Sequence, residues 1–131
     1  MSEQPGAWPA QWLRGVLELA VLAVVDRGET YGYRIATDLE RAGLGSVKGG
    51  TLYPLLGRLE DDGALAATWR ESPSGPGRKW YATTTAGRGR LHEQGAAWQR
   101  FAELTAGLVA GDTPSHDRDD ALVRTPLGGR P

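Results

Sequence analysis

Four side chains that can donate hydrogen bonds lie close together near the middle of the chain: Lys48, Thr51, Tyr53 and Arg58. Leucines recur between them at three- and four-residue steps, at positions Leu52, Leu55, Leu56 and Leu59. That spacing puts the leucines on one stripe of a helix, so the four polar side chains face elsewhere. We expect one face of this helix to pack on a core and the other to present donors and an aromatic ring to a groove.

A second group of bases lies beside a segment rich in turn residues. Ala64 to Arg70 and Arg78 to Thr83 are typical of strands, and Glu71 to Gly77 between them holds Ser74 among prolines and glycines. This pattern predicts a β-hairpin with a turn-rich tip and with Arg78 and Lys79 beside it. A lone surface base is usually only solvated, but a pair beside such a tip favours contact with phosphate groups.

The charge of the chain is unevenly distributed along the sequence. From Lys48 to Arg90 there are seven bases and four acids, whereas the whole chain has a net charge of −1. The overall charge argues against indiscriminate binding to nucleic acid. The local basic excess coincides with the helix and the hairpin that carry the candidate contacts, which favours a specific nucleic-acid interface there.

Three further segments have the apolar spacing of helices. Leu13 to Asp26 is apolar on nearly all sides, so it must be covered on more than one side, as a central core helix or by a partner subunit. Gly32 to Ala42 follows Thr30, which we expect to cap it, and ends at glycines. Thr84 is expected to cap a long helix over Thr85 to Ala110.

The middle helix spans about Lys48 to Asp62, with Ser46 as a candidate cap and Pro54 expected in its first turn. The order helix, helix, helix, strand, hairpin, helix predicts a mainly α fold with a small β-hairpin. That layout is a winged helix-turn-helix followed by a long C-terminal dimerisation helix. The expected divisions are an arm over 1–12, the DNA-binding domain over 13–83, the dimerisation helix over 84–110 and a disordered tail over 111–131.

The last helix has too little of its own chain to pack on. Its apolar stripe consists of Leu91, Trp98, Phe101, Leu104 and Leu108. A two-helix seam with a second copy would cover this stripe, so we expect a homodimer. Two copies of Trp98 near the two-fold axis could hold a planar apolar or cationic molecule, with Gln94 at the rim. Alternatively, Trp98 is only a packing anchor of the seam.

Several functional classes lack support in the sequence. There is no cysteine, and the two histidines, His92 and His116, are far apart, so no metal site or cofactor is expected. The acids occur in surface-like runs without a neighbouring nucleophile, which argues against an enzyme. No apolar run is long enough for a membrane span and the N-terminus lacks a signal pattern, so we expect no membrane partner and a cytoplasmic location.

The chain resembles the PadR family of bacterial transcriptional regulators, particularly its short members with one C-terminal helix. The resemblance covers about Leu13 to Leu108 and rests most on Gly50-Thr51-Leu52-Tyr53-Pro54. It is supported by Leu13-Arg14-Gly15 with Leu17-Glu18-Leu19, Tyr31-Gly32-Tyr33-Arg34-Ile35, Arg58-Leu59-Glu60 with Gly63, Gly75-Pro76, Arg78-Lys79-Trp80-Tyr81, and Thr84 to Gly87. Thr83 departs from the pattern, because a leucine is usual there.

The resemblance implies a homodimeric repressor that binds a pseudo-palindromic operator in double-stranded DNA and is released by a small-molecule effector. The DNA-binding residues expected on this basis are Tyr31, Lys48, Thr51, Tyr53, Arg58, Ser74, Arg78 and Lys79. Some multidrug-binding relatives carry a tryptophan midway along the last helix, and Trp98 matches it. The expected ligand site consists of Trp98, Trp12, Gln94 and Phe101. The alternatives are a winged helix that binds protein and a regulator without a ligand site.

Overall fold

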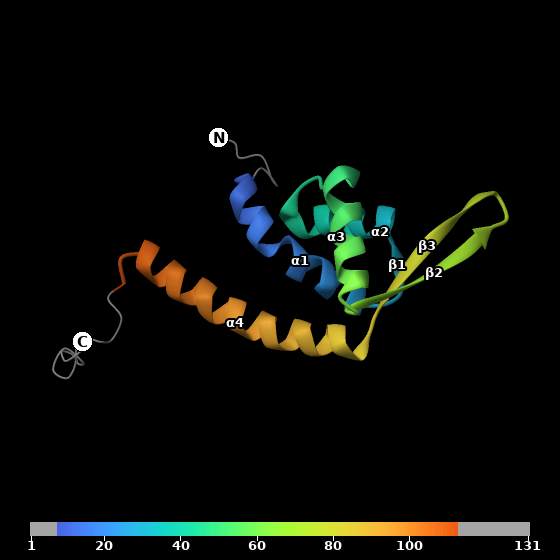
Figure 1. Ribbon diagram of the computed structural model, residues 1–131. Coiled ribbons are helices and arrows are strands. Elements are labelled where there is room, and N and C mark those ends of the chain that lie inside the picture. The colour runs from blue at the N-terminus through green and yellow to red at the C-terminus, as the bar shows by residue number, and fades with distance from the viewer. Residues whose placement is uncertain (1–7, 113–131) are drawn as a thin grey trace. The chain divides into compact units, whose positions relative to one another are not determined.

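The computed structural model of the protein describes residues 8–112 (Figure 1). The elements in chain order are α1 (Ala10–Asp26), β1 (Thr30–Tyr31), α2 (Gly32–Leu39), a π-helical turn η1 (Glu40–Leu44), α3 (Gly49–Asp61), β2 (Leu65–Ser72), β3 (Gly75–Thr83) and α4 (Thr85–Val109). The predicted mainly α winged helix-turn-helix is confirmed. The chain divides into two compact units, Met1–Gly95 and Ala96–Pro131.

The core of the first unit forms where α1, α2 and α3 pack on the base of the sheet. The largest fully buried side chains come from all three helices: Val21, Leu22, Val25, Ile35, Leu39, Leu52, Leu56 and Leu59. Leu65 and Tyr81 close the core from the strands. Burial raises the pKa of the Tyr81 phenol above its usual value. The spacing of these apolar residues is the pattern that located the three helices in the sequence.

The sheet is antiparallel with the strand order β1-β3-β2. The short strand β1 was not predicted from the sequence; in it Thr30 pairs with Tyr81 and Tyr31 pairs with Trp80. The prediction that Thr30 caps α2 is therefore wrong: Thr30 is buried in the sheet, and Tyr31 holds the N-cap position without a capping hydrogen bond. Two residues carry no periodic pattern, so only the tertiary pairing reveals this strand.

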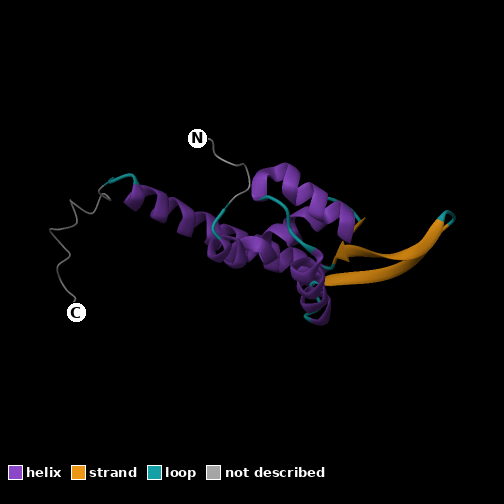
Figure 2. Ribbon diagram, turned by 90° about the horizontal axis from the view of Figure 1, so that it is seen from above, coloured by secondary structure: helices purple, strands orange, loops and turns teal. Residues whose placement is uncertain are grey.

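The hairpin of β2 and β3, the wing, extends away from α1, α2 and α3 (Figure 2). Its turn is shorter than predicted, because β2 continues to Ser72 and β3 begins at Gly75. Pro73 and Ser74 alone form the tip. A Cβ atom at Gly77 would lie 2.8 Å from the backbone oxygen of Arg70, so the close approach of the two strands requires glycine there.

Two expectations about the start of α3 are wrong. Lys48 holds the N-cap position, and no side chain makes a capping hydrogen bond to the helix. Ser46 therefore does not cap α3. Pro54 lies inside the helix and not in its first turn. Because proline has no N–H, the Gly50 carbonyl, four residues earlier, lacks the hydrogen bond that it would otherwise accept from position 54. The buried leucine face supplies the stabilisation that this bond does not.

The helix α1 begins at Ala10, so the last residues of the predicted arm over 1–12 are helical. Trp8 precedes it, and its indole Nε1 donates a hydrogen bond of 2.7 Å to the Gly43 carbonyl. Residues 1–7 lie outside the described residues. The predicted tail over 111–131 lies outside them from residue 113 onward. Gly111, with φ of +82°, follows the end of α4.

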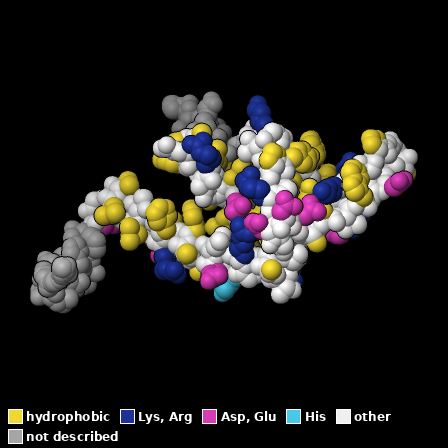
Figure 3. Space-filling view, viewed as in Figure 1, with side chains coloured by type: hydrophobic (Ala, Val, Ile, Leu, Met, Phe, Trp, Pro, Cys, Tyr) yellow, Lys and Arg dark blue, Asp and Glu magenta, His cyan; other side chains and the backbone are white. Residues whose placement is uncertain are grey.

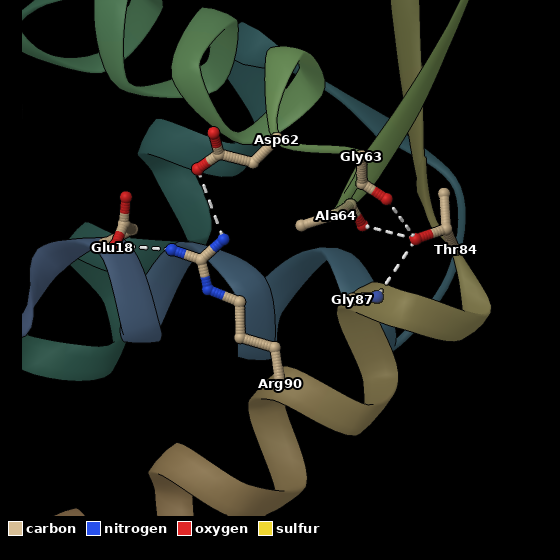
Figure 4. Close-up of polar contacts among 7 residues, drawn as sticks. All are labelled: Glu18, Asp62, Gly63, Ala64, Thr84, Gly87 and Arg90. Atoms are coloured by element: carbon tan, nitrogen blue, oxygen red, sulfur yellow. Dashed lines mark hydrogen bonds and ion pairs between the residues drawn. The ribbon is translucent and has the colours of Figure 1, made fainter.

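The start of α4 is held against the end of α3 by polar contacts (Figure 4). As predicted, Thr84 caps the helix: its hydroxyl oxygen accepts a bond of 2.9 Å from the Gly87 N–H. The same hydroxyl lies 2.6 Å from the Gly63 carbonyl oxygen. Arg90 donates from Nη2 to Glu18 on α1 at 3.1 Å and from Nη1 to Asp62 at 3.3 Å. These contacts fix the start of α4 against α1 and the end of α3.

Within residues 8–112, no helix is long and apolar enough to cross a membrane.

Candidate nucleic-acid interface

The helix α3 has one buried and one exposed face, as the leucine spacing predicted. Leu52, Leu55, Leu56 and Leu59 are buried in the core. The four candidate side chains on and before the helix, Lys48, Thr51, Tyr53 and Arg58, are all exposed. Lys48 and Arg58 form no ion pair with any residue between 8 and 112. This face therefore offers two free cations and two hydroxyl groups to solvent.

Tyr53 is held in place although its side chain is 53% exposed. Its ring lies over Gly32 at the start of α2, where a Cβ atom would overlap the ring, and it also lies beside Gly49. Glycine at position 32 is therefore required for the ring to dock. The contact fixes the phenol on the flank of α3 that faces α2.

Tyr33 is a candidate contact that the sequence analysis did not select. It is 75% exposed on the first turn of α2. Together with Tyr53 it borders a hollow of about 320 Å³ between α2 and the start of α3. Its place in the Tyr31-Gly32-Tyr33 run was visible in the sequence, but nothing there distinguished a solvent-facing ring from a packed one.

The two neighbouring bases of the wing lie on opposite faces of the hairpin. Lys79 faces α3, where its Nζ lies 3.1 Å from Glu60 Oε1. The hydrogen bond to Glu60 raises the pKa of Lys79 above its usual 10.5. The charged pair therefore persists through neutral pH and is lost only as pH rises through that raised value. Figure 3 shows acidic and basic side chains side by side at the base of the wing.

Arg78 lies on the other face and has no ion-pair partner among residues 8–112. Its guanidinium carbon is 4.1 Å from the centre of the Tyr31 ring. Arg78 also stands directly opposite Arg70 in the β2–β3 register. Arg70, in contrast, is neutralised by Glu29 at 2.6 Å. Of the two predicted wing bases, Arg78 is the one whose charge is left for a partner.

The structure brings some of the predicted DNA-binding residues together and leaves others apart. Tyr31 contacts Arg78, and Tyr53 contacts Gly32, the residue that follows Tyr31, so the flank of α3 is continuous with the wing. Lys79, on β3, donates a hydrogen bond to Glu60 on α3. Ser74 is exposed at the wing tip, where its backbone N–H donates to Ser72 Oγ at 3.4 Å.

The four predicted ligand-binding residues fall in both units. Trp98 and Phe101 are exposed on α4 in the second unit, and Gln94 is exposed near the end of the first. Trp12 is exposed on α1, with its ring centre 6.3 Å from that of Trp8. Hydrophobic side chains follow the second half of α4 (Figure 3). Among residues 8–112, no group of three or more acidic or histidine side chains could hold a metal ion.

Comparison with known proteins identifies the family of the chain. The family described as "Transcriptional regulator PadR-like family" matches residues 21–93. "Transcriptional regulator Rv3488" of Mycobacterium tuberculosis is 35% identical over 97 residues, which cover 74% of this chain and 89% of that protein.

Two solved structures have the same fold. The PadR-like transcriptional regulator from Bacillus cereus is 34% identical with a TM-score of 0.68, and the match covers 76% of this chain and 96% of that one. The PadR family transcriptional regulator from Eggerthella lenta is 35% identical with a TM-score of 0.69, over 76% and 87% of the two chains. The resemblance inferred from the motifs is confirmed, and the chain belongs to the PadR-like family of transcriptional regulators, not to a family of enzymes.

Proposed function

We propose that the protein is a homodimeric repressor that binds a pseudo-palindromic DNA operator. The observation that carries this proposal is the outer face of α3, where Lys48 and Arg58 are exposed and have no acidic partner within residues 8–112. In this role α3 enters the major groove, and the wing contacts the adjacent backbone through Arg78. The proposal places the protein in the cytoplasm, where bacterial DNA lies.

The dimer is proposed from the second half of α4, where Trp98, Phe101, Leu104, Leu108 and Val109 are exposed. A helix of one chain with such a stripe buries it against a second copy. Two copies bind two half-sites of an operator, so the two-fold symmetry of the protein matches that of the DNA.

An effector that releases the operator is proposed to bind at Trp98, with Gln94, Phe101 and Trp12 as further contacts. The indole face is suited to planar apolar or cationic molecules. A regulator without a ligand site is the alternative, in which Trp98 serves only to pack the dimer. Titration of the dimer with planar cationic dyes, read by quenching of tryptophan fluorescence, separates the two.

The DNA-binding proposal is tested with the DNA that flanks the protein's own gene, by fluorescence anisotropy over a range of salt concentrations. We expect tight binding whose logarithm falls steeply with the logarithm of salt concentration. Replacing both Lys48 and Arg58 by alanine should weaken binding. The salt slope should fall by about one unit for each removed base that had bound a phosphate. Arg14→Ala, an exposed base on α1, is the matched control. Equal tight binding by all three proteins would mean that this face of α3 does not contact DNA. Failure of wild type to bind would leave a protein-binding winged helix as the better description.

A further inference from the structure

A cluster of guanidinium groups and aromatic rings covers the outer face of the sheet. Tyr31 and Trp80 are paired across β1 and β3, with ring centres 4.9 Å apart and planes at 61°. The guanidinium carbon of Arg34 lies 5.5 Å from the Tyr31 ring centre, and that of Arg78 lies 4.1 Å from it. Arg70 lies 4.7 Å from the Trp80 ring centre. Three arginines from α2, β2 and β3 thus converge on two rings.

The three arginines differ in how their charges are balanced. Glu29 neutralises Arg70 at 2.6 Å. Arg34 and Arg78 are exposed and have no acid within ion-pair distance among residues 8–112. Two like charges beside one ring repel each other, and an anion that approaches both relieves this repulsion. A guanidinium group that stacks on a ring keeps its N–H edge free for such an anion.

We propose that Tyr31 is a positioning residue whose ring holds Arg34 and Arg78 ready for the phosphates of one DNA strand. This inference rests on the proposed function and deepens it, because it adds Arg34 as a DNA contact and assigns Tyr31 an indirect role. The location supports a DNA phosphate as the anion. The next residue, Gly32, lies against Tyr53 on α3, so the arginine pair adjoins the proposed groove-binding helix.

The Tyr31 ring already restricts the long side chains of Arg34 and Arg78. They therefore lose less conformational freedom when they bind phosphate. A phenylalanine ring serves this purpose as well as tyrosine does, since the cation interacts with the ring face. The hydroxyl of Tyr31 is then dispensable, which distinguishes a positioning role from direct hydrogen bonding to DNA.

The test compares Tyr31→Phe, Tyr31→Leu, Arg34→Ala and Arg78→Ala in the full chain, with operator DNA, by anisotropy at several salt concentrations. Each arginine variant should lower both the affinity and the salt slope, the slope by about one unit per subunit. Tyr31→Leu should lower the affinity about threefold to tenfold with a nearly unchanged slope, since both charges remain. Tyr31→Phe should bind within about twofold of wild type.

A double-mutant cycle completes the test. In the Arg34→Ala, Arg78→Ala background, Tyr31→Leu should have almost no further effect on affinity. The proposal is overturned if Tyr31→Leu lowers the affinity in this background as much as it does in wild type. It is also overturned if Tyr31→Phe lowers the affinity of the wild-type protein as much as Tyr31→Leu does. A lowered melting temperature of Tyr31→Leu with normal DNA affinity would also overturn it, because the ring would then act only in packing. Failure of wild type to bind DNA at all would instead reject the proposed function.

Discussion

The two halves of α4 belong to one continuous helix but have opposite relations to the rest of their chain. The first half, up to Gly95, is anchored by the Thr84 cap, by the Arg90 ion pairs and by Leu91, which packs against the core. The second half, from Ala96, leaves large apolar side chains exposed, among them Trp98, Phe101, Leu104 and Leu108. One half is therefore covered by the chain itself, and the other presents the apolar stripe on which the proposed dimer rests.

This contrast indicates how the two halves should respond to mutation. A change in the first half acts within one chain, so it should alter the stability of the monomer and the DNA-binding domain. A change on the exposed stripe should leave the fold of each chain intact and act only through assembly. Thermal unfolding and measurement of the dimer dissociation constant separate these two kinds of effect.

Gly87→Ala should have the largest effect. A Cβ atom at this position would overlap the Ala64 carbonyl group, and backbone atoms cannot move aside as a flexible side chain can. We expect a loss of about 3 kcal/mol or more in the free energy of unfolding. Gly89→Ala, two residues further along, has nothing within 4 Å and serves as the control. It should stabilise the helix by about 0.5–1 kcal/mol. Similar effects of both variants would mean that the first half is not docked on Ala64.

Leu104→Gln should have the next largest effect, and it should act on the dimer. The side chain is exposed in the single chain, so its replacement removes no packing there. In a two-fold dimer both copies of the leucine are replaced at once, and we expect the dissociation constant to rise about tenfold or more. Sedimentation measures the assembly, and circular dichroism should report an unchanged helix content. A stable dimer of this variant would place the interface elsewhere.

Trp98→Ala should have a smaller effect on assembly and a complete effect on ligand binding. If Trp98 lines an effector site, the dimer and its operator binding persist while the quenching of fluorescence by planar cationic dyes disappears. The indole is 43% exposed in the single chain, so a part of its face is open to a ligand or a second copy. Dissociation of the variant dimer, with no dye binding by wild type, would mean that Trp98 only packs.

Sequence reasoning found the fold because its signals are local. The leucine spacing of α3 and the Thr84 cap each depend on residues within one or two turns, and both are present in the structure. The partners of the bases could not be found in this way. Lys79 pairs with Glu60 and Arg78 stacks on Tyr31, although the two bases are adjacent. The two bases differ because neighbouring side chains of β3 point to opposite faces of the sheet, and only one of these faces meets α3.

The same limit applies to Arg90, which sequence reasoning treated only as one base among seven. Its two acidic partners come from α1 and from the residue after α3, so they are distant in sequence and meet only in the fold. Glu18 and Asp62 would each be ordinary surface acids without it. The anchoring of α4 is therefore a property of tertiary structure that local pattern does not encode.

Arg90→Gln should have the smallest effect, about 1 kcal/mol, because the three side chains are partly exposed and solvent screens their charges. Arg100→Gln, on the exposed second half of α4, is the matched control and should not change monomer stability. The difference between the two variants should shrink as salt is added, since salt screens the ion pairs of Arg90. A difference that persists at high salt would show that the aliphatic part of Arg90 anchors the helix by packing. Equal stability of both variants at low salt would contradict the distinction between the two halves of α4, since the ion pairs would then contribute nothing to the docking of the first.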